Sequence, residues 1–370
     1  MQSWINIDIN SIRHNVGEIR KLLDPEIKII AVVKSNAYGH GLVEVARAAW
    51  AAGAEMLAVD SVDEGIQLRI AKVRAPILVL GYVQQGEYQR VIEHTLQISI
   101  FNKEDIPVLA QTASGAHTPV RVHLKIDTGL HRLGINSNEI VEYAKAIKQE
   151  PYLILEALYS HFADTSDIQY SREQIKEMQS ALFLLQQGGF DELPPVHMAA
   201  SGAIKKFPEA HFDMVRPGLA IYGLEESIMN LKPALKWSTK IVQVKRVSEG
   251  SQVGLGLTYK TKRITSLAVV PVGYADGYHR ELSNKAEMLY GGKRVKVVGN
   301  VGMNSTIIDT TGLSAKVGDQ VVLIGKSVGD TIKVEDLARW AKTDPREIVA
   351  CIPSIIYRHF CESEEEEIVG

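Results

Sequence analysis

The feature that most constrains this chain is a regular alternation of short apolar runs with amphipathic stretches between about residues 29 and 223. Most of the apolar runs are nearly continuous, which is typical of parallel strands that are covered on both faces. The eight runs cover residues 29–34, 56–61, 76–82, 96–101, 120–127, 153–161, 196–201 and 213–222. Eight strands separated by helices predict an α/β fold, a (β/α)8 TIM barrel.

After residue 223 the pattern changes to short strands separated by turn signals. We expect strands at 236–247, 266–272, 287–290, 293–298, 303–309, 320–325 and 348–356, and one helix at 334–341. The sequence thus predicts a barrel over residues 11–229 and a C-terminal mainly β domain over residues 230–370. An N-terminal strand within residues 1–10 is expected to join that second domain, because it precedes the first barrel strand and must pair somewhere. The acidic run at 362–367 is expected to be a solvated terminus.

The composition favours an enzyme that acts on a small molecule. A formal net charge of -3 provides no basic field for nucleic acid or anionic lipid, so we expect neither partner. No apolar run reaches the roughly 18 residues of a membrane span, and the N-terminus lacks a secretory pattern. Cys351 and Cys361 form neither a disulfide framework nor a clustered metal motif, so no metal is expected. The predicted location is cytoplasmic.

The chemistry of a TIM barrel lies at the C-terminal ends of its strands. The first predicted strand ends at Lys34, in the string VVKSNAYGHG. A lysine that terminates an apolar strand directs its amine into the barrel mouth. Partial desolvation there favours the neutral amine that Schiff-base chemistry needs. Lys34 is therefore a candidate catalytic residue.

The string VVKSNAYGHG resembles the cofactor-attachment motif of the alanine racemase family. Seven further strings follow in that family's order: LKIDTGLHRLG, YSHFADTSD, HMAASGA, FDMVRPGLAIYG, VGLGLTY, PVGYADG and VGMN. The resemblance implies pyridoxal 5'-phosphate (PLP) held by Lys34 as a Schiff base, and a PLP-dependent isomerase that racemises an amino acid, alanine first. It also implies a homodimer in which the C-terminal domain of one chain completes the active site of the other.

The resemblance also implies roles for four further barrel residues. Arg132 corresponds to an arginine near the cofactor's phenolic oxygen and the substrate carboxylate, and Lys125 to a lysine that is often carbamylated to hold that arginine. His161 corresponds to a histidine that links the cofactor arginine to the catalytic tyrosine. Arg216, in MVRPG, corresponds to the arginine facing the pyridine nitrogen. A guanidinium there keeps that nitrogen unprotonated and favours racemase-like over decarboxylase-like tuning.

The cofactor phosphate is expected at the loops after the seventh and eighth strands, where barrels bind phosphate through backbone N–H groups. Ser201 offers a hydroxyl there, and Gly218 and Leu219 offer backbone amides. Tyr38 adds a phenol from the first loop.

The sequence departs from the family pattern at the second acid/base group. The family places a tyrosine in V-x-Y-G-x-T-Y, and this chain has Leu255 there, which can neither take nor give a proton. Tyr259 and Tyr274 remain, in positions that the family uses for packing and substrate-side contacts. Met303 is kept as a substrate-side residue, whereas Asn304 replaces an aspartate.

A further departure is expected near the C-terminus. Ser354 takes the place of a phosphate-binding tyrosine, and the usual Val-Pro-Arg is replaced by the tripeptide 356–358.

Four functions remain open. The chain racemises alanine, with water, His161 or Tyr259 serving the second face; it racemises another amino acid, with Leu255 shaping a more apolar pocket; it carries out one-faced chemistry such as retro-aldol cleavage or transamination; or it carries PLP without catalysis. Arg132, His161, Arg216 and Met303 argue against the last. General acid/base catalysis contributes on the order of 10²–10⁴-fold, so its loss slows a racemase without abolishing cofactor binding.

Overall fold

The computed structural model describes residues 2–362, so the acidic run lies outside the described residues from residue 363 onward. The chain forms two compact units. The barrel unit comprises Arg13–Ser35 and Leu42–Leu231, and the β unit comprises Met1–Ile12, Asn36–Gly41 and Lys232–Gly370. The segment Asn36–Gly41 thus belongs with the β unit although it lies within the barrel sequence. The domain bounds predicted from the sequence, 1–10, 11–229 and 230–370, remain a prediction.

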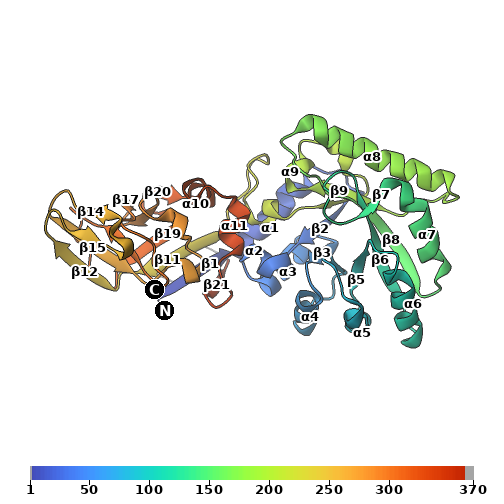
Figure 1. The fold of residues 1–370 in the computed structure, drawn as a ribbon, viewed down its shortest axis with the longest axis horizontal. Coiled ribbons are helices and arrows are strands. Elements are labelled where there is room, and N and C mark those ends of the chain that lie inside the picture. Colours follow the sequence, from blue (N-terminus) through green and yellow to red (C-terminus); the bar gives the residue numbers. More distant parts are fainter. Residues whose placement is uncertain (1, 363–370) are drawn as a thin grey trace. The chain divides into compact units, whose positions relative to one another are not determined.

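The barrel unit contains a closed ring of eight parallel strands (Figure 1). In ring order these are β2 (Lys28–Val32), β3 (Met56–Val59), β4 (Ile77–Val79), β5 (Gln97–Ile100), β6 (Val120–Asp127), β8 (Leu153–Tyr159), β9 (Val196–Ala200) and β10 (Met214–Arg216). The pairings β5–β6 and β10–β2 close the ring. A two-residue strand, β7 (Ile135–Asn136), is added beside β6. The predicted TIM barrel is confirmed.

Helices surround the barrel strands on the outside (Figure 1). They are α1 (Ile9–Arg20), α3 (Leu42–Ala51), α4 (Val62–Ile70), α5 (Tyr88–Glu93), α6 (Asp105–Gly115), α7 (Ile140–Gln149), α8 (Ile168–Gln187) and the short α9 (Ser201–Ile204). Local caps begin two of them: Ser61 accepts a hydrogen bond from the Glu64 N–H, and Asp167 accepts one from the Tyr170 N–H. None of the helices in residues 2–362 is long and apolar enough to cross a membrane.

Most barrel strands end earlier than the apolar runs suggest. β2 ends at Val32 rather than Lys34, and β8 ends at Tyr159 rather than His161. The residues beyond each strand still lie at its C-terminal end, where their backbones leave the ladder and their side chains become available for chemistry.

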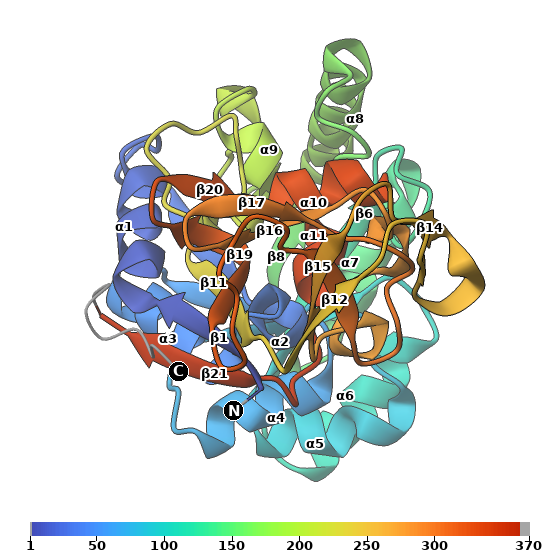
Figure 2. The same ribbon diagram turned by 90° about the vertical axis from the view of Figure 1, so that its left-hand side faces the viewer.

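The β unit contains one large mixed sheet and two small ones (Figure 2). The large sheet has the order β17 (Lys293–Lys296), β16 (Glu287–Tyr290), β19 (Gln320–Ser327), β11 (Leu235–Lys240), β1 (Ser3–Asp8) and β21 (Tyr357–Cys361), and β20 (Asp330–Ile332) pairs with β19. The N-terminal β1 is antiparallel to β11 and parallel to β21. The small sheets are β12 (Gln243–Val247), β15 (Thr265–Val270) and β18 (Thr306–Asp309), and the pair β13 (Gln252–Val253) and β14 (Tyr259–Lys260). The predicted mainly β character is confirmed.

Two sequence expectations in the β unit are wrong. Residues 348–356 were expected as a strand, but helix α11 (Pro345–Ala350) occupies the first part of this range, after helix α10 (Val334–Ala341). The Asp344 carboxylate accepts a hydrogen bond from the Arg346 N–H, and Pro345 fits the first helical position, so a helix starts here. The expected strand 236–247 is divided into β11 and β12, which belong to different sheets.

Candidate active site

Lys34 lies two residues after the end of the first barrel strand and forms an ion pair with an acidic residue. Its Nζ lies 2.8 Å from Oδ1 of Asp60, which follows β3. Two hydrogen bonds hold the end of β2, since the Tyr222 hydroxyl donates to the Val32 carbonyl (2.9 Å) and the Val32 N–H donates to the Pro217 carbonyl (2.9 Å). The strand ends of the barrel thus fix the base of the lysine side chain.

Asp60 is a residue that sequence reasoning missed. Its N–H donates to Glu64 Oε2 (2.9 Å), and the Gly81 N–H donates to its carbonyl (3.1 Å). A Cβ at Gly81 would lie 2.3 Å from that carbonyl oxygen, so only glycine fits there. The available signal was a carboxylate at the C-terminal end of a predicted strand, next along the sheet from Lys34.

The turn after Lys34 is left-handed. Ser35, Asn36, Ala37 and Tyr38 have φ values of 50–55°, in the five-residue turn α2 (Lys34–Tyr38). Each left-handed non-glycine residue costs about 1–2 kcal/mol, and such strain concentrates at functional sites. The surrounding structure must therefore hold this turn in place.

Contacts within the β unit hold the far end of this turn. The buried His40 ring lies with Nδ1 2.8 Å from the Tyr38 carbonyl oxygen, and Arg358 Nε donates to the Gly39 carbonyl (2.7 Å). A Cβ at Gly39 would lie 2.1 Å from the Val349 carbonyl oxygen, so the backbone passes very close there. Tyr38 belongs to the β unit, and its contact with a phosphate stays a prediction.

Arg216 is buried at the C-terminal end of β10 and contacts only neutral acceptors. Its guanidinium donates to His197 Nδ1 (2.6 Å), to His161 Nδ1 (3.2 Å) and to the carbonyls of Ser160, His197 and Met198. Burial lowers the pKa of Arg216 to about 10, which still leaves it charged at neutral pH. Since an uncompensated buried charge is costly, this cation indicates a function.

The contacts of Arg216 fix the protons on the neighbouring histidines. A guanidinium has no acceptor, so Nδ1 of His197 and Nδ1 of His161 must both be unprotonated. His197 then donates from Nε2 to His123 Nδ1 (2.9 Å), and His123 donates from Nε2 to Gln97 Oε1 (2.8 Å). Burial and the Arg216 charge lower the pKa values of His123 and His161 to about 3, and that of His197 well below its usual range. All three rings are neutral.

Lys125 and Arg132 add two more positive groups. Lys125 is buried on β6, with Nζ 5.4 Å from the centre of the Tyr159 ring. Burial, together with the charges of Arg132, Arg216 and Lys34, lowers the pKa of Lys125 to about 8. Arg132 is exposed on the loop after β6, which Asp127 shapes by accepting hydrogen bonds from the N–H groups of Gly129 and His131.

Ser201 joins the loops after β9 and β10. Its buried Oγ accepts hydrogen bonds from the N–H groups of Gly218 (2.9 Å) and Ala220 (3.1 Å), and Leu219 lies between those two residues in the chain. No acceptor for the Ser201 hydroxyl proton is found within residues 2–362. An available O–H donor between two short helix N-termini suits a phosphate oxygen.

The charges of the barrel unit suit PLP. The charges of Arg132, Arg216 and Lys34 all lower the pKa of Lys125, and within the described part of the chain the only salt bridge that any of these four residues forms is Lys34–Asp60. An excess of cations in a partly buried site requires anions, and PLP with an amino acid brings a phosphate, a phenolate and a carboxylate. The residues present therefore fit this cofactor.

Leu255 lies on an ordered loop of the β unit. It begins the 3-10 turn η5 (Leu255–Leu257), between Gly254 (φ 75°) and Gly256 (φ 77°), and is 75% exposed. Asn300 Nδ2 donates to the Leu255 carbonyl (2.9 Å). The loop thus presents an aliphatic side chain to the outside of the β unit.

Two other predicted substrate-side residues are packed through their backbones. The N–H groups of Tyr274 and Ala275 donate to the carbonyls of Gly302 (3.0 Å) and Met303 (2.9 Å). A Cβ at Gly273 would lie 2.2 Å from the Gly302 carbonyl oxygen, so this glycine permits the contact. The β unit therefore holds Tyr274 and Met303 together, and both side chains are exposed.

The C-terminal departure lies on a loop that one arginine holds. Arg358 donates to the carbonyls of Ile352, Pro353 and Ile356 as well as to that of Gly39. Ser354 is exposed on this loop. That Ser354 replaces a phosphate-binding tyrosine of the family, and so removes one contact with the phosphate, remains a prediction.

Comparison with known proteins identifies the family. Models of the alanine racemase N-terminal and C-terminal domains match residues 7–226 and 234–360. The alanine racemase 2 of Caldanaerobacter subterraneus subsp. tengcongensis is 37% identical over 353 residues, which cover 93% of this chain and 91% of that protein.

Solved structures agree with the sequence match. The alanine racemase from D-cycloserine producing Streptomyces lavendulae has a TM-score of 0.93 at 32% identity, covering 99% of this chain and 98% of that one. The alanine racemase from Bartonella henselae with covalently bound pyridoxal phosphate has a TM-score of 0.87 at 25% identity, covering 98% of this chain and 100% of that one. The chain belongs to the alanine racemase family and is a PLP-dependent isomerase.

Proposed function

We propose that this chain interconverts L- and D-alanine slowly, with Lys34 as the cofactor lysine and the proton carrier on one face. The observation that carries the proposal is the barrel-end cation set, in which Lys34 follows β2 while buried Arg216 has only neutral partners. When bound, PLP withdraws electrons from the α-carbon of an amino acid and makes its proton acidic.

The residues of the barrel unit would hold the cofactor by charge and hydrogen bonds. Lys34 would hold its aldehyde carbon, Arg216 would face the ring nitrogen, and Ser201 with Gly218 and Leu219 would bind the phosphate. Because burial lowers the pKa of Arg216 only to about 10, its charge persists at neutral pH and keeps a facing nitrogen unprotonated. This charge favours racemisation over decarboxylation.

Lys125 supports the same arrangement through a proposed modification. With its pKa lowered to about 8, the amine is partly neutral at physiological pH and can react with carbon dioxide. The resulting carbamate would replace a buried cation with an anion beside Arg132 and Arg216. Arg132 would then be held for the substrate carboxylate.

His161 is a poor candidate for the base on the second face. Its Nδ1 lone pair already accepts a hydrogen bond from Arg216, and its pKa is lowered to about 3 by burial and by that charge. A neutral ring whose free nitrogen carries a proton cannot accept another one at neutral pH. Water or Tyr259 remains for that face, which is why we propose a slow reaction.

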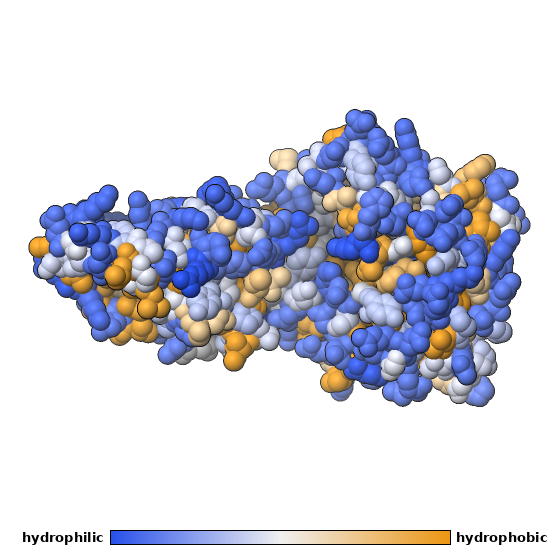
Figure 3. Space-filling model, viewed as in Figure 1, coloured by the Kyte–Doolittle hydropathy of each residue, from blue (hydrophilic) through white to orange (hydrophobic). Residues whose placement is uncertain are grey.

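We further propose a cytoplasmic homodimer. The β unit exposes several large apolar side chains, namely Leu255, Leu257, Ile264 and Met303. Hydrophobic residues (orange) lie among hydrophilic ones on the surface of both units (Figure 3). Leu255 and Leu257 belong to one turn, and neighbouring apolar residues that stay exposed often belong to a protein interface. The oligomeric state measured by light scattering tests this part.

Incorporation of deuterium at the α-carbon of alanine tests the proposed reaction directly. Incubation of the holoenzyme with L-alanine in D2O should give deuterated D-alanine, resolved by chiral chromatography and mass spectrometry. If deuterium enters L-alanine and no D-alanine forms, protons are exchanged on one face only. This result would favour one-faced chemistry over racemisation, and the exposed aliphatic side chain of Leu255 is consistent with it. Release of an aldehyde from a β-hydroxy amino acid would identify retro-aldol cleavage. If the enzyme racemises other amino acids but not alanine, the proposed substrate is wrong and the racemase acts on another amino acid.

A further inference from the structure

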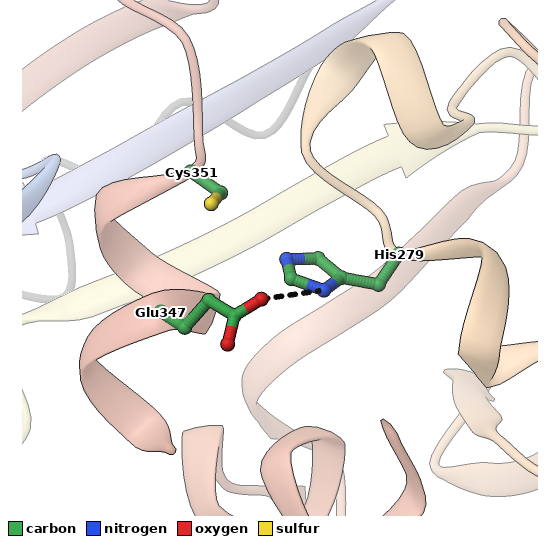
Figure 4. Close-up of side chains that lie close together, drawn as sticks. All are labelled: His279, Glu347 and Cys351. Atoms are coloured by element: carbon green, nitrogen blue, oxygen red, sulfur yellow. Dashed lines mark ion pairs between the residues drawn. The ribbon is translucent and has the colours of Figure 1, made fainter. Parts of the chain in front are cut away.

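We infer that His279, Glu347 and Cys351 form a divalent metal site in the β unit, and that its preferred ion is Zn²⁺. The three side chains face one another in Figure 4, and one ligand atom of each lies within 4.8 Å of the others. His279 Nδ1 is 3.8 Å from Glu347 Oε1. This inference is independent of the function proposed for the barrel.

The spacing of these atoms suits a small tetrahedral ion. Zn²⁺ binds imidazole nitrogen and carboxylate oxygen at about 2.0–2.2 Å and thiolate sulfur at about 2.3 Å, so the three ligand atoms would lie about 3.3–3.6 Å apart. The distance of 3.8 Å between His279 Nδ1 and Glu347 Oε1 is slightly longer than this. Small rotations of the Cys351 and Glu347 side chains would bring the remaining distances into range. Three protein ligands would leave a fourth position for water.

The histidine ring has a nitrogen to spare. His279 Nε2 is buried, and among the described residues it has no hydrogen-bond partner. The nearest acidic contact of the other nitrogen, at 3.8 Å, is longer than a hydrogen bond. Since no strong bond fixes the ring proton, a ring nitrogen is available to a metal. A buried polar atom without a partner also costs free energy, which coordination through Nε2 would recover and coordination through Nδ1 would not.

The backbone holds the three ligands together. Glu347 and Cys351 are four residues apart at α11, and the Cys351 N–H donates to the Glu347 carbonyl (3.0 Å). Gly277, two residues before His279, packs against this segment, because a Cβ there would lie 2.8 Å from the Cys351 carbonyl oxygen. The Thr343 hydroxyl donates to Glu347 Oε2 and orients the carboxylate. Such outer contacts are typical of metal sites.

The ligand types favour zinc over harder ions. A thiolate is a soft donor and an imidazole a borderline one, and Zn²⁺ also accepts a carboxylate, whereas Mg²⁺ and Ca²⁺ prefer oxygen alone. A cavity of about 550 Å³ lined by Tyr274, His279, Arg280 and Cys351 gives the ion and its water access. Without metal, burial and the Glu347 charge raise the pKa of Cys351. Zn²⁺ would replace the thiol proton and separate the two negative groups.

The alternative of a reactive cysteine is less favourable. A nucleophilic cysteine needs a lowered pKa, and the pKa of Cys351 is shifted the other way. Cys361 is buried and donates weakly to the Ile7 carbonyl, so it serves as the control thiol.

The test is a Zn²⁺ titration of the metal-stripped holoenzyme against a chromophoric chelator. We expect one Zn²⁺ per chain with release of one proton. The variants C351S, H279N and E347Q should each weaken binding at least tenfold, whereas C361S should bind as the parent does. Cd²⁺ should produce a thiolate charge-transfer band that is absent only in C351S. T343V, which removes an orienting bond, should weaken binding about tenfold.

Two results would overturn the site. One is the absence of stoichiometric Zn²⁺ binding by the folded holoenzyme; the other is an affinity that is unchanged in C351S. Thermal unfolding of each variant without metal separates a lost ligand from a lost fold. Rapid alkylation of Cys351 that Zn²⁺ does not slow would indicate a reactive thiol instead of a metal ligand.

Discussion

The two units carry their candidate functional residues in opposite ways. In the barrel unit, Arg216 and Lys125 are buried, and Arg216 is held by five hydrogen bonds. In the β unit, Leu255 and Met303 are more than half exposed and are held through their backbones. The barrel unit thus holds buried cationic side chains in fixed positions, while the β unit exposes apolar side chains on its surface. A substitution in the barrel should damage cofactor chemistry, whereas one in the β unit should change which reaction follows.

The largest effect is expected from Lys34→Ala. Removing the amine should abolish the absorption band of the lysine-bound cofactor and all deuterium exchange into alanine. Lys28→Ala, at the exposed first position of β2, is the matched control and should keep both. Spectra of the two variants after PLP addition and gel filtration measure the difference. A band that persists in Lys34→Ala would refute the cofactor assignment.

Leu255→Tyr tests whether the β unit lacks only the second acid/base group. A phenol in place of the exposed leucine should raise alanine racemisation by about 10²–10⁴-fold, the usual contribution of one acid/base group. Leu257→Tyr, two residues along the same turn and also exposed, is the control and should give no such gain. Initial rates in both directions measure it. An unchanged rate would show that the barrel is not set for racemisation, and would favour one-faced chemistry.

The barrel could be predicted further than the β unit. Continuous apolar runs give parallel strands directly, and the lysine and arginine at their ends remained at those ends in the structure. Asp60 was missed because its partner is a neighbour in the sheet and not in the sequence. In the β unit, the end of α11 was mistaken for a strand because Ile348, Val349 and Ala350 begin a largely apolar run, and only Asp344 and Pro345 indicate a helix.

Asp60→Asn is expected to have an intermediate effect. The Lys34–Asp60 pair is partly exposed, with 35% and 52% of the two side chains accessible, so its loss should affect stability little. It should slow proton transfer at Lys34 by about tenfold, seen as a lower kcat with a nearly unchanged KM. The control is Asp63→Asn on α4, which breaks an exposed ion pair with Arg90 on α5. Equal rates in the two variants would leave Asp60 without a role in the reaction.

The smallest effect is expected from Lys125→Met, on stability. Burial lowers the pKa of Lys125 from 10.5 to about 8, so the folded state binds its proton less tightly than the unfolded state does. The parent protein is therefore destabilised by this group below about pH 8 and recovers as the pH rises toward 10.5. Methionine removes the charge at similar volume, so the variant should be about 1–2 kcal/mol more stable at pH 7 in bicarbonate-free buffer.

The difference in stability between Lys125→Met and the parent should shrink at pH 10. If Lys125 is carbamylated, added bicarbonate should stabilise only the parent. Denaturant unfolding of the cofactor-free proteins at both pH values measures this, and a pH-independent difference would mean that Lys125 carries no buried charge.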